Sequence, residues 1–248
     1  MPSVSISQVQ SYLFCPLKFR FQYVDKLAFP WRPGALAFGT SIHAAVEWFL
    51  KELMAGRFPN VRQVQDLFRA DWYAQNLEPL VFAKGETEES LADKGAELLA
   101  LFLNHNRLPP VAVEERFEIE LADPETGELL GTEFRGYMDC VEEGPVLVEL
   151  KTAARAYDDG SIARHLQLSA YALVVFLKTG VIPELRLDVL VKTRLPRYDC
   201  NPTTRTVEDL AWTARLLDRV ARAIDGEHFF PNPSWRCTEC EFFAACQQ

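Results

Sequence analysis

The stretch from Gly136 to Lys151, GYMDCVEEGPVLVELK, contains the features that decide the fold of this chain. It predicts two antiparallel strands joined by a turn at Glu143-Gly144, because aliphatic runs lie on both sides of this pair. Side chains alternate along a strand, so Glu149 and Lys151 lie on the same face, and the turn can bring Asp139 near Glu149. Two carboxylates and an ammonium group can therefore converge at one point.

This convergence is suited to metal chemistry. Carboxylate oxygens together with water favour a hard divalent cation such as Mg²⁺ or Mn²⁺. A bound cation makes water a potent nucleophile near neutral pH, and a lysine beside it can position that water or stabilise charge on a phosphate. The alternative is a surface ion pair, which is the common role of Glu-x-Lys on a strand.

The segments around this stretch predict an α/β (α+β) fold, a core sheet flanked by helices. Strands are expected at 111–121, 132–141, 145–151 and 185–192, and helices at 5–14, 17–24, 39–55, 60–76, 88–106, 161–178 and 207–224. We expect one domain, 1–248, with an N-terminal helical insertion at 39–108, a core at 111–225 and a C-terminal cysteine-rich tail at 231–248.

The composition excludes several classes of protein. Hydrophobic residues make up 48% and charged residues 25% of the 248, which is typical of a globular chain rather than a disordered one. No run approaches the roughly 20 uncharged apolar residues of a membrane span, and the N-terminus does not resemble a signal peptide. We therefore expect a cytoplasmic protein. The chain has no Gly-x-x-x-x-Gly-Lys-Ser/Thr loop, which excludes a helicase motor.

Three further residues qualify as parts of a site. His43 follows Gly39 in a Gly-x-x-x-His pattern at the start of a helix, and an imidazole ligand would shift the metal preference from Mg²⁺ toward Mn²⁺. Gln167 and Tyr171 are four residues apart and share one helix face. The alternatives are a structural histidine and a partly exposed polar edge of a core helix.

Taken together, these motifs resemble the RecB-like branch of the PD-(D/E)XK nuclease superfamily. They occur in order as Gly39-x-x-x-His43, Gly136-x-x-Asp139, Glu149-x-Lys151 and Gln167-x-x-x-Tyr171, and the opening from Ser5 to Cys15-Pro16 also resembles that branch. The resemblance implies a restriction-endonuclease-like core and a single nuclease domain, with 111–225 as its catalytic core. It also implies a metal-dependent DNA exonuclease serving repair, recombination or CRISPR adaptation.

The resemblance also assigns roles to residues. It implies that His43, Asp139, Glu149 and the Leu150 carbonyl bind the metal and that Lys151 is the catalytic lysine. Gln167 and Tyr171 would support the site and the DNA. The rival hypothesis is a non-catalytic DNA-binding module of a helicase or integrase complex, which the intact Asp139, Glu149 and Lys151 disfavour.

The cysteines form a second constellation. Cys237-x-x-Cys240, Cys246 and the distant Cys15 can supply four thiolates, which fit either Zn²⁺ or an iron–sulfur cluster, and spacing alone leaves the choice open. Iron–sulfur RecB-like nucleases, among them the CRISPR spacer-acquisition exonuclease and the AddB nuclease domain, have a similar layout. The resemblance therefore implies a 4Fe-4S cluster that joins the two termini, residue 15 with 231–248. Cys140 and Cys200 are expected to be bystanders.

The charge pattern sets expectations about DNA. The net charge of −9 argues against a nucleic-acid binder, but the segment 114–149 alone has twelve acidic and two basic residues. These acids could form a solvated face or a cation site. Candidate phosphate contacts are Lys192, Arg194, Arg197, Arg155 and Arg164, and candidate stacking residues, each with packing as the alternative, are Trp31, Trp48, Trp72 and Trp235. No base-reading motif is present, so we expect sequence-tolerant binding of single strands or duplex ends.

Overall fold

The computed structural model describes residues 1–74, 79–105, 108–144 and 146–247. Its main sheet has the order β1-β5-β6-β7-β8, with β4 on the other edge of β5. The strands of this sheet are β1 (Ser3–Val4), β4 (Pro110–Ala122), β5 (Leu129–Glu142), β6 (Val146–Ala153), β7 (Glu184–Val191) and β8 (Arg197–Thr203). The β1–β5 and β6–β7 pairs are parallel and the others are antiparallel. A separate parallel pair joins β2 (Arg32–Pro33) and β3 (Leu80–Val81).

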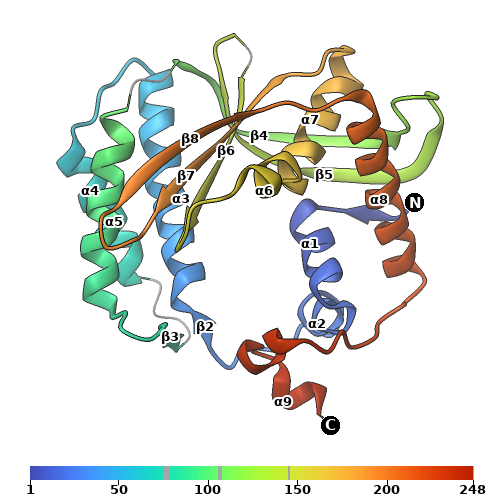
Figure 1. Cartoon of the computed structure of the whole chain (residues 1–248), viewed down its shortest axis with the longest axis horizontal. Coiled ribbons are helices and arrows are strands. Elements are labelled where there is room, and N and C mark those ends of the chain that lie inside the picture. Colours follow the sequence, from blue (N-terminus) through green and yellow to red (C-terminus); the bar gives the residue numbers. More distant parts are fainter. Residues whose placement is uncertain (75–78, 106–107, 145, 248) are drawn as a thin grey trace.

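Helices cover both faces of this sheet (Figure 1). The helices are α1 (Ile6–Phe14), α2 (Pro16–Phe19), the π-helix η1 (Arg20–Val24), α3 (Gly34–Met54), α4 (Val61–Ala74), α5 (Glu88–Leu103), α6 (Asp159–Ala163), α7 (Leu166–Thr179), α8 (Val207–Asp225), the 3-10 helix η2 (Trp235–Glu239) and α9 (Phe243–Cys246). One core packs α1, α7 and α8 on one face, and a second core packs α3, α4 and α5 on the other. The mixed α/β prediction is confirmed.

Some element boundaries differ from the sequence-based expectations. The helix expected at 161–178 is interrupted, because Nδ1 of His165 accepts a hydrogen bond from the backbone of Leu168 and begins a new helix. The helix expected from Gly39 begins at Gly34 instead. Strand β8 was not predicted, because this edge strand alternates polar residues and contains Pro202, which lowers strand propensity. Cys200 is therefore an exposed strand residue. The predicted termini at Asn76 and Asn106 and the strand residue Pro145 lie outside the described residues.

Helix α7 and the short α6 before it form the most apolar helical stretch. By length and composition, Asp159–Thr179 could cross a membrane, with a mean hydropathy of 1.2. Residues such as Leu168, Leu173 and Val174 of this stretch are buried in the first core. The stretch is thus explained as a core helix that packs on the sheet.

The sheet divides where β5 meets β6. Among the described residues, only Cys140, Val141 and Glu142 of β5 pair with β6, whereas β6 pairs with β7 along its whole length from Val146 to Ala153. Met138 packs in the first core and Cys140 in the second, so the alternation of β5 changes at the residue between them. This fork creates a gap in the sheet that begins beside Asp139.

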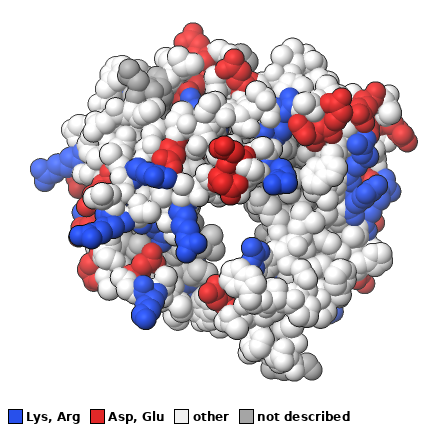
Figure 2. Space-filling view, viewed as in Figure 1, with Lys and Arg blue, Asp and Glu red and all other residues white. Residues whose placement is uncertain are grey.

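The C-terminal tail lies against the N-terminal helices. The backbone N–H of Leu17 donates to the Phe230 carbonyl at 3.0 Å, and Lys18 forms an ion pair with Glu241 at 2.6 Å. The space-filling view shows a central opening with α3 on one side and α1 and α2 on the other, and the tail lies below it (Figures 1 and 2). Lys and Arg side chains are present at the rim (Figure 2). The two ends of the chain together complete a ring around this opening.

Candidate active site

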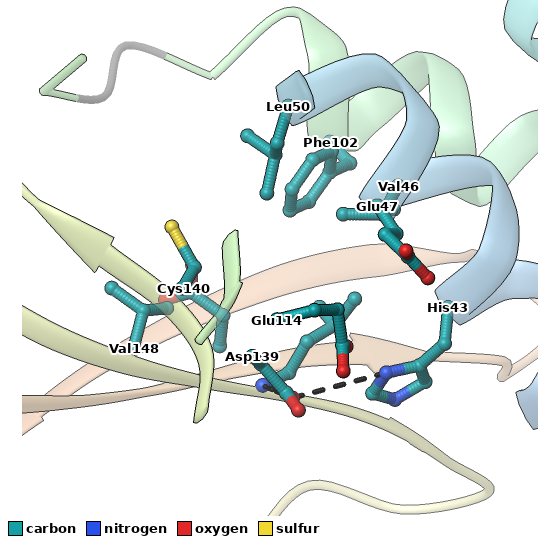
Figure 3. A pocket seen from close by; sticks show the side chains of 11 residues that line it. His43, Val46, Glu47, Leu50, Phe102, Glu114, Asp139, Cys140 and Val148 are labelled. Atoms are coloured by element: carbon teal, nitrogen blue, oxygen red, sulfur yellow. Dashed lines mark hydrogen bonds and ion pairs between the residues drawn. The ribbon is translucent and has the colours of Figure 1, made fainter. Parts of the chain in front are cut away.

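Asp139 lies at the fork between β5 and β6. Its Oδ2 accepts a hydrogen bond of 3.1 Å from the backbone N–H of Leu150, and the same oxygen lies 3.8 Å from Nδ1 of His43 on α3 (Figure 3). The hydrogen bond fixes the carboxylate at the point where β6 diverges from β5. The fork thus brings together residues from β5, β6 and α3, as the sequence predicts.

Two glycines allow this close assembly. A Cβ atom on Gly39 would lie 3.3 Å from Oγ1 of Thr152, so α3 approaches β6 closely one turn before His43. A Cβ atom on Gly136 would lie 2.9 Å from Cζ of Phe117, which is closer than normal packing permits. Close packing therefore explains why both motifs have glycine, which lacks a Cβ atom, at these positions.

Glu149 and Lys151 share the opposite face of β6 from Leu150. The ammonium of Lys151 forms an ion pair with Glu149 and donates a 2.9 Å hydrogen bond to Oε1 of Gln167. The amide of Gln167 in turn donates to the hydroxyl of Tyr171 at 2.9 Å. The shared helix face of Gln167 and Tyr171 is confirmed, and this chain of bonds orients the lysine.

Burial controls the charges at this site. Glu149 is fully buried, and apart from the ion pair neither of its oxygens has a hydrogen-bond partner among the described residues. Desolvation and the charge of Asp139 raise the pKa of Glu149 to about 8. Desolvation lowers the pKa of His43, which favours the neutral imidazole. Burial has the largest single effect on Lys151 and opposes its charge, but its acidic neighbours, Glu149 first and then Asp139, together outweigh burial and raise the lysine pKa.

The sequence did not single out three acidic residues beside this site. Glu47, Glu114 and Asp188 line a small cavity of about 20 Å³ together with His43 and Asp139. In Figure 3 the carboxylates of Glu114 and Asp139 point toward the His43 ring, whereas the Cys140 sulfur points away. Only the position of Glu47, one helical turn after His43, offered a signal in the sequence.

Glu114 has unusual backbone and electrostatic properties. Its φ of 53° is in the left-handed region, which non-glycine residues rarely adopt. Desolvation and the neighbouring charge of Asp139 raise its pKa to about 7. The strained residue lies where β4 faces the change of alternation in β5, so the distortion is a property of the site.

The donor set at the fork fits a hard cation. Across the described ranges, no three His, Cys, Asp or Glu side chains are gathered closely enough to hold a metal as they stand. Nevertheless, Glu149 has buried oxygens without hydrogen bonds, and His43 is held neutral beside Asp139. Carboxylates and a neutral imidazole are the ligands expected for Mg²⁺ or Mn²⁺.

The predicted phosphate contacts differ in availability. Lys192 is paired with Glu86 at 2.6 Å, and Arg197 is paired with Asp199 at 3.0 Å. Arg155, Arg164 and Arg194 are exposed. Of the predicted stacking residues, Trp72 is fully buried, Trp31 and Trp48 are half-buried, and Trp235 is 73% exposed. The buried Trp72 is thus a packing residue.

The four predicted cluster ligands line one pocket. Cys15, Cys237, Cys240 and Cys246 surround a volume of about 320 Å³, with walls that include Phe14, Phe21, Phe242 and Phe243. Burial raises the pKa of Cys240. One early and three late cysteines thus line the same largely apolar pocket, although no three of them in the described ranges lie close enough to hold a metal as they stand.

Comparison with known proteins agrees with this geometry. The sequence model of the PD-(D/E)XK nuclease superfamily matches residues 3–247. Gene 69 protein of Mycobacterium phage D29 is 25% identical over 282 residues, which cover 99% of this chain and 97% of that protein. Gene 69 protein of Mycobacterium phage L5 is 34% identical over 79 residues, 31% of this chain and 26% of that protein.

A solved structure supports the fold. The crystal structure of a "Putative exonuclease" from Eubacterium rectale superposes with a TM-score of 0.63 at 16% sequence identity, and the match covers 99% of this chain and 87% of that one. The family match over nearly the whole length agrees with the arrangement of Asp139, Glu149 and Lys151 at the fork. The chain belongs to the PD-(D/E)XK nuclease superfamily.

Proposed function

We propose that this nuclease is a metal-dependent DNA exonuclease that acts on single strands or DNA ends. The observation that carries this proposal is the convergence of Asp139, Glu149 and Lys151 at the fork between β5 and β6. The nearby Gln167 and Tyr171 hold the lysine in place. A surface ion pair would not need the full burial that Glu149 has.

Asp139, Glu149 and the Leu150 carbonyl, together with His43, would hold Mg²⁺ or Mn²⁺. Such a cation supplies positive charge that polarises a phosphate and acidifies a water. The acidic surroundings of Lys151, which include Asp139 as well as Glu149, raise its pKa, so its ammonium can neutralise charge that develops on the phosphate. Gln167 restricts the lysine side chain, which reduces the entropy lost when it meets the substrate.

The ring shape supports the preference for free ends. A closed ring admits a strand only by threading, and threading requires a free end. Figure 2 shows the central opening, and Lys151, Gly39 and His43 line a pocket of about 540 Å³ beside α3.

Digestion of labelled DNA tests the proposal. Linear single-stranded, linear double-stranded and circular single-stranded DNA would be incubated with Mn²⁺, with Mg²⁺ or with EDTA. We expect cleavage of linear DNA that requires the metal, no cleavage of circles, and no activity of Lys151→Ala or Glu149→Ala. Arg62→Gln, at a side chain of α4 that is 90% exposed, is the matched control. A folded Lys151→Ala protein that cuts at the normal rate would overturn the assignment, and a wild-type protein that binds DNA without cutting it would favour the non-catalytic module.

We further propose that Cys15, Cys237, Cys240 and Cys246 hold a 4Fe-4S cluster. The shared pocket supports this proposal, because four Cys thiolates are the ligands that hold such a cluster. When bound, the cluster supplies cross-links between the two ends of the chain. Anaerobic purification with iron, sulfide and zinc analysis tests it: four irons and four sulfides per chain are expected, and stoichiometric zinc would overturn it.

The cellular setting also remains a proposal. The expected partners are DNA and a helicase or integrase protein, in the cytoplasm, in repair, recombination or CRISPR adaptation. Co-purification of the chain with such a protein from its own host is the direct test.

A further inference from the structure

We propose that Arg116, Arg135 and Tyr137 form a binding site for the DNA strand next to the candidate active site. This inference rests on the proposed nuclease function and extends it by naming where the strand lies. The three side chains line a pocket of about 540 Å³, whose other wall is the N-terminal end of α1 at Ser5–Ser7. None of these residues was among the predicted DNA contacts.

The strand register places these residues together. Arg116 of β4 is opposite Tyr137 of β5, and Glu118 is opposite Arg135. Phe117, which lies between Arg116 and Glu118, and Phe134, which precedes Arg135, are buried in the first core. Because side chains alternate along strands, both arginines and the tyrosine project from the other face of the β4–β5 ribbon, which is exposed.

The arginine charges are available to a ligand. In the described part of the chain, Arg135 has no ion pair or hydrogen bond from its exposed side chain. Arg116 donates to Glu118 at 2.8 Å, but the two side chains are 67% and 49% exposed, so this pair is weak. A phosphate can replace such a partner at little cost. Lys192, a predicted contact, is held by Glu86 with its side chain only 8% exposed.

Tyr137 adds a surface for a base. It is 53% exposed, although large aromatic side chains on a sheet usually pack. Aromatic rings accept any base by stacking, so a tyrosine between two arginines suits a single strand without sequence preference. Alternation of phosphate contacts and stacking explains why this exposed face holds these three residues.

The pocket is continuous with the chemistry. Tyr171 lines it, and the Tyr171 hydroxyl accepts a hydrogen bond from Gln167, which binds Lys151. Asp139 follows Tyr137 by two residues, about 7 Å along the strand. A strand that rests on Tyr137 is therefore one nucleotide or so from the fork.

The acidic surroundings confine the strand to this path. Arg116 and Arg135 are the only basic residues between 114 and 149, a segment with twelve acids. Glu118 lies beside both arginines and is displaced when a phosphate binds, whereas exposed Glu120, opposite Glu133, would repel a phosphate farther along the ribbon. The acidic segment thus leaves one cationic strip, and it leads toward the site.

Fluorescence anisotropy with a labelled 20-nucleotide oligo-dT in EDTA, where no cleavage occurs, tests the proposal. The Arg116→Gln/Arg135→Gln variant should weaken binding about tenfold or more at low salt and reduce the slope of log K against log salt by about 1.4, since each lost contact on a single strand removes about 0.7. Tyr137→Ala should weaken binding by about 5- to 150-fold, and Tyr137→Phe should restore it.

The charge-matched control is Arg57→Gln/Arg62→Gln, which removes two exposed arginines, one just after α3 and one on α4. If the wild-type protein cuts DNA but the Arg116/Arg135 variant matches this control in affinity and slope, the inference fails and the nuclease proposal stands. If that variant loses affinity and slope while the wild-type protein never cuts DNA, the binding site stands and the proposed exonuclease activity fails.

Discussion

Glu149→Gln should abolish nuclease activity and change how the stability of the fold depends on pH. Glu149 is fully buried, and its pKa is raised to about 8 from an ordinary value of 4.5. Above pH 4.5 the unfolded chain loses this proton while the folded chain keeps it. The wild-type fold therefore loses stability as the pH rises from 4.5 to about 8, and loses no more above that pH. Glutamine does not titrate, so the variant escapes this loss.

The magnitude follows from linkage. Each pH unit in the window costs the wild-type protein at most about 1.4 kcal/mol, or about 4–5 kcal/mol over the window. The substitution also removes the ion pair between Glu149 and Lys151, and this loss lowers the stability of the variant at every pH. The firm expectation is thus the trend: the free energy of unfolding of the variant minus that of the wild type increases steadily from pH 5 to 8.

Urea unfolding followed by circular dichroism measures this difference, in EDTA to remove divalent metal. Glu120→Gln, at an exposed position of β4, is the matched control. A Glu149→Gln difference that stays constant or decreases between pH 5 and 8 would refute the reasoning. In metal-containing buffer the same variant should have lost nuclease activity, because it lacks a carboxylate at the fork.

Three further outcomes can be checked on the same preparations. Gln167→Leu should lower the cleavage rate about 10- to 100-fold without unfolding the protein, because Lys151 loses its 2.9 Å hydrogen bond to Gln167. Initial rates measure the cleavage, and circular dichroism measures the fold. Arg186→Met should destabilise the fold by about 3–5 kcal/mol in urea, because two fully buried carboxylates lose their ion pairs; an unchanged midpoint would contradict this. Gly136→Ala should cost about 1–3 kcal/mol, because its Cβ would lie 2.9 Å from Phe117; a melting temperature equal to that of wild type would show that the ring moves freely.

Much of the fold follows from local patterns. The capping box from Ser5 to Gln8, with reciprocal bonds of 2.9 and 3.4 Å, begins α1 within the range predicted for this helix, 5–14. The alternation of 145–151 correctly places Glu149 and Lys151 on one face, and the four-residue spacing joins Gln167 to Tyr171. These features depend on periods of two and 3.6 residues, which are visible in a single chain.

Other features depend on contacts between distant segments. The divergence of β5 from β6 and the left-handed Glu114 arise from strand pairing, because register is set by the whole sheet. The break before α7 required the side chain of His165 to cap a new helix. No local period reports these arrangements.

The sequence by itself determined which side chains could form the site, namely the carboxylates, lysine, histidine and cysteines in their order along the chain. It also determined the α/β pattern of the fold. Only the tertiary structure decided which charges are available and which groups meet. It paired Lys192 with Glu86, left Arg135 exposed, and brought Cys15 into one pocket with Cys237. The physical reason is that ion pairing and burial depend on neighbours far apart in the chain, which folding alone brings together.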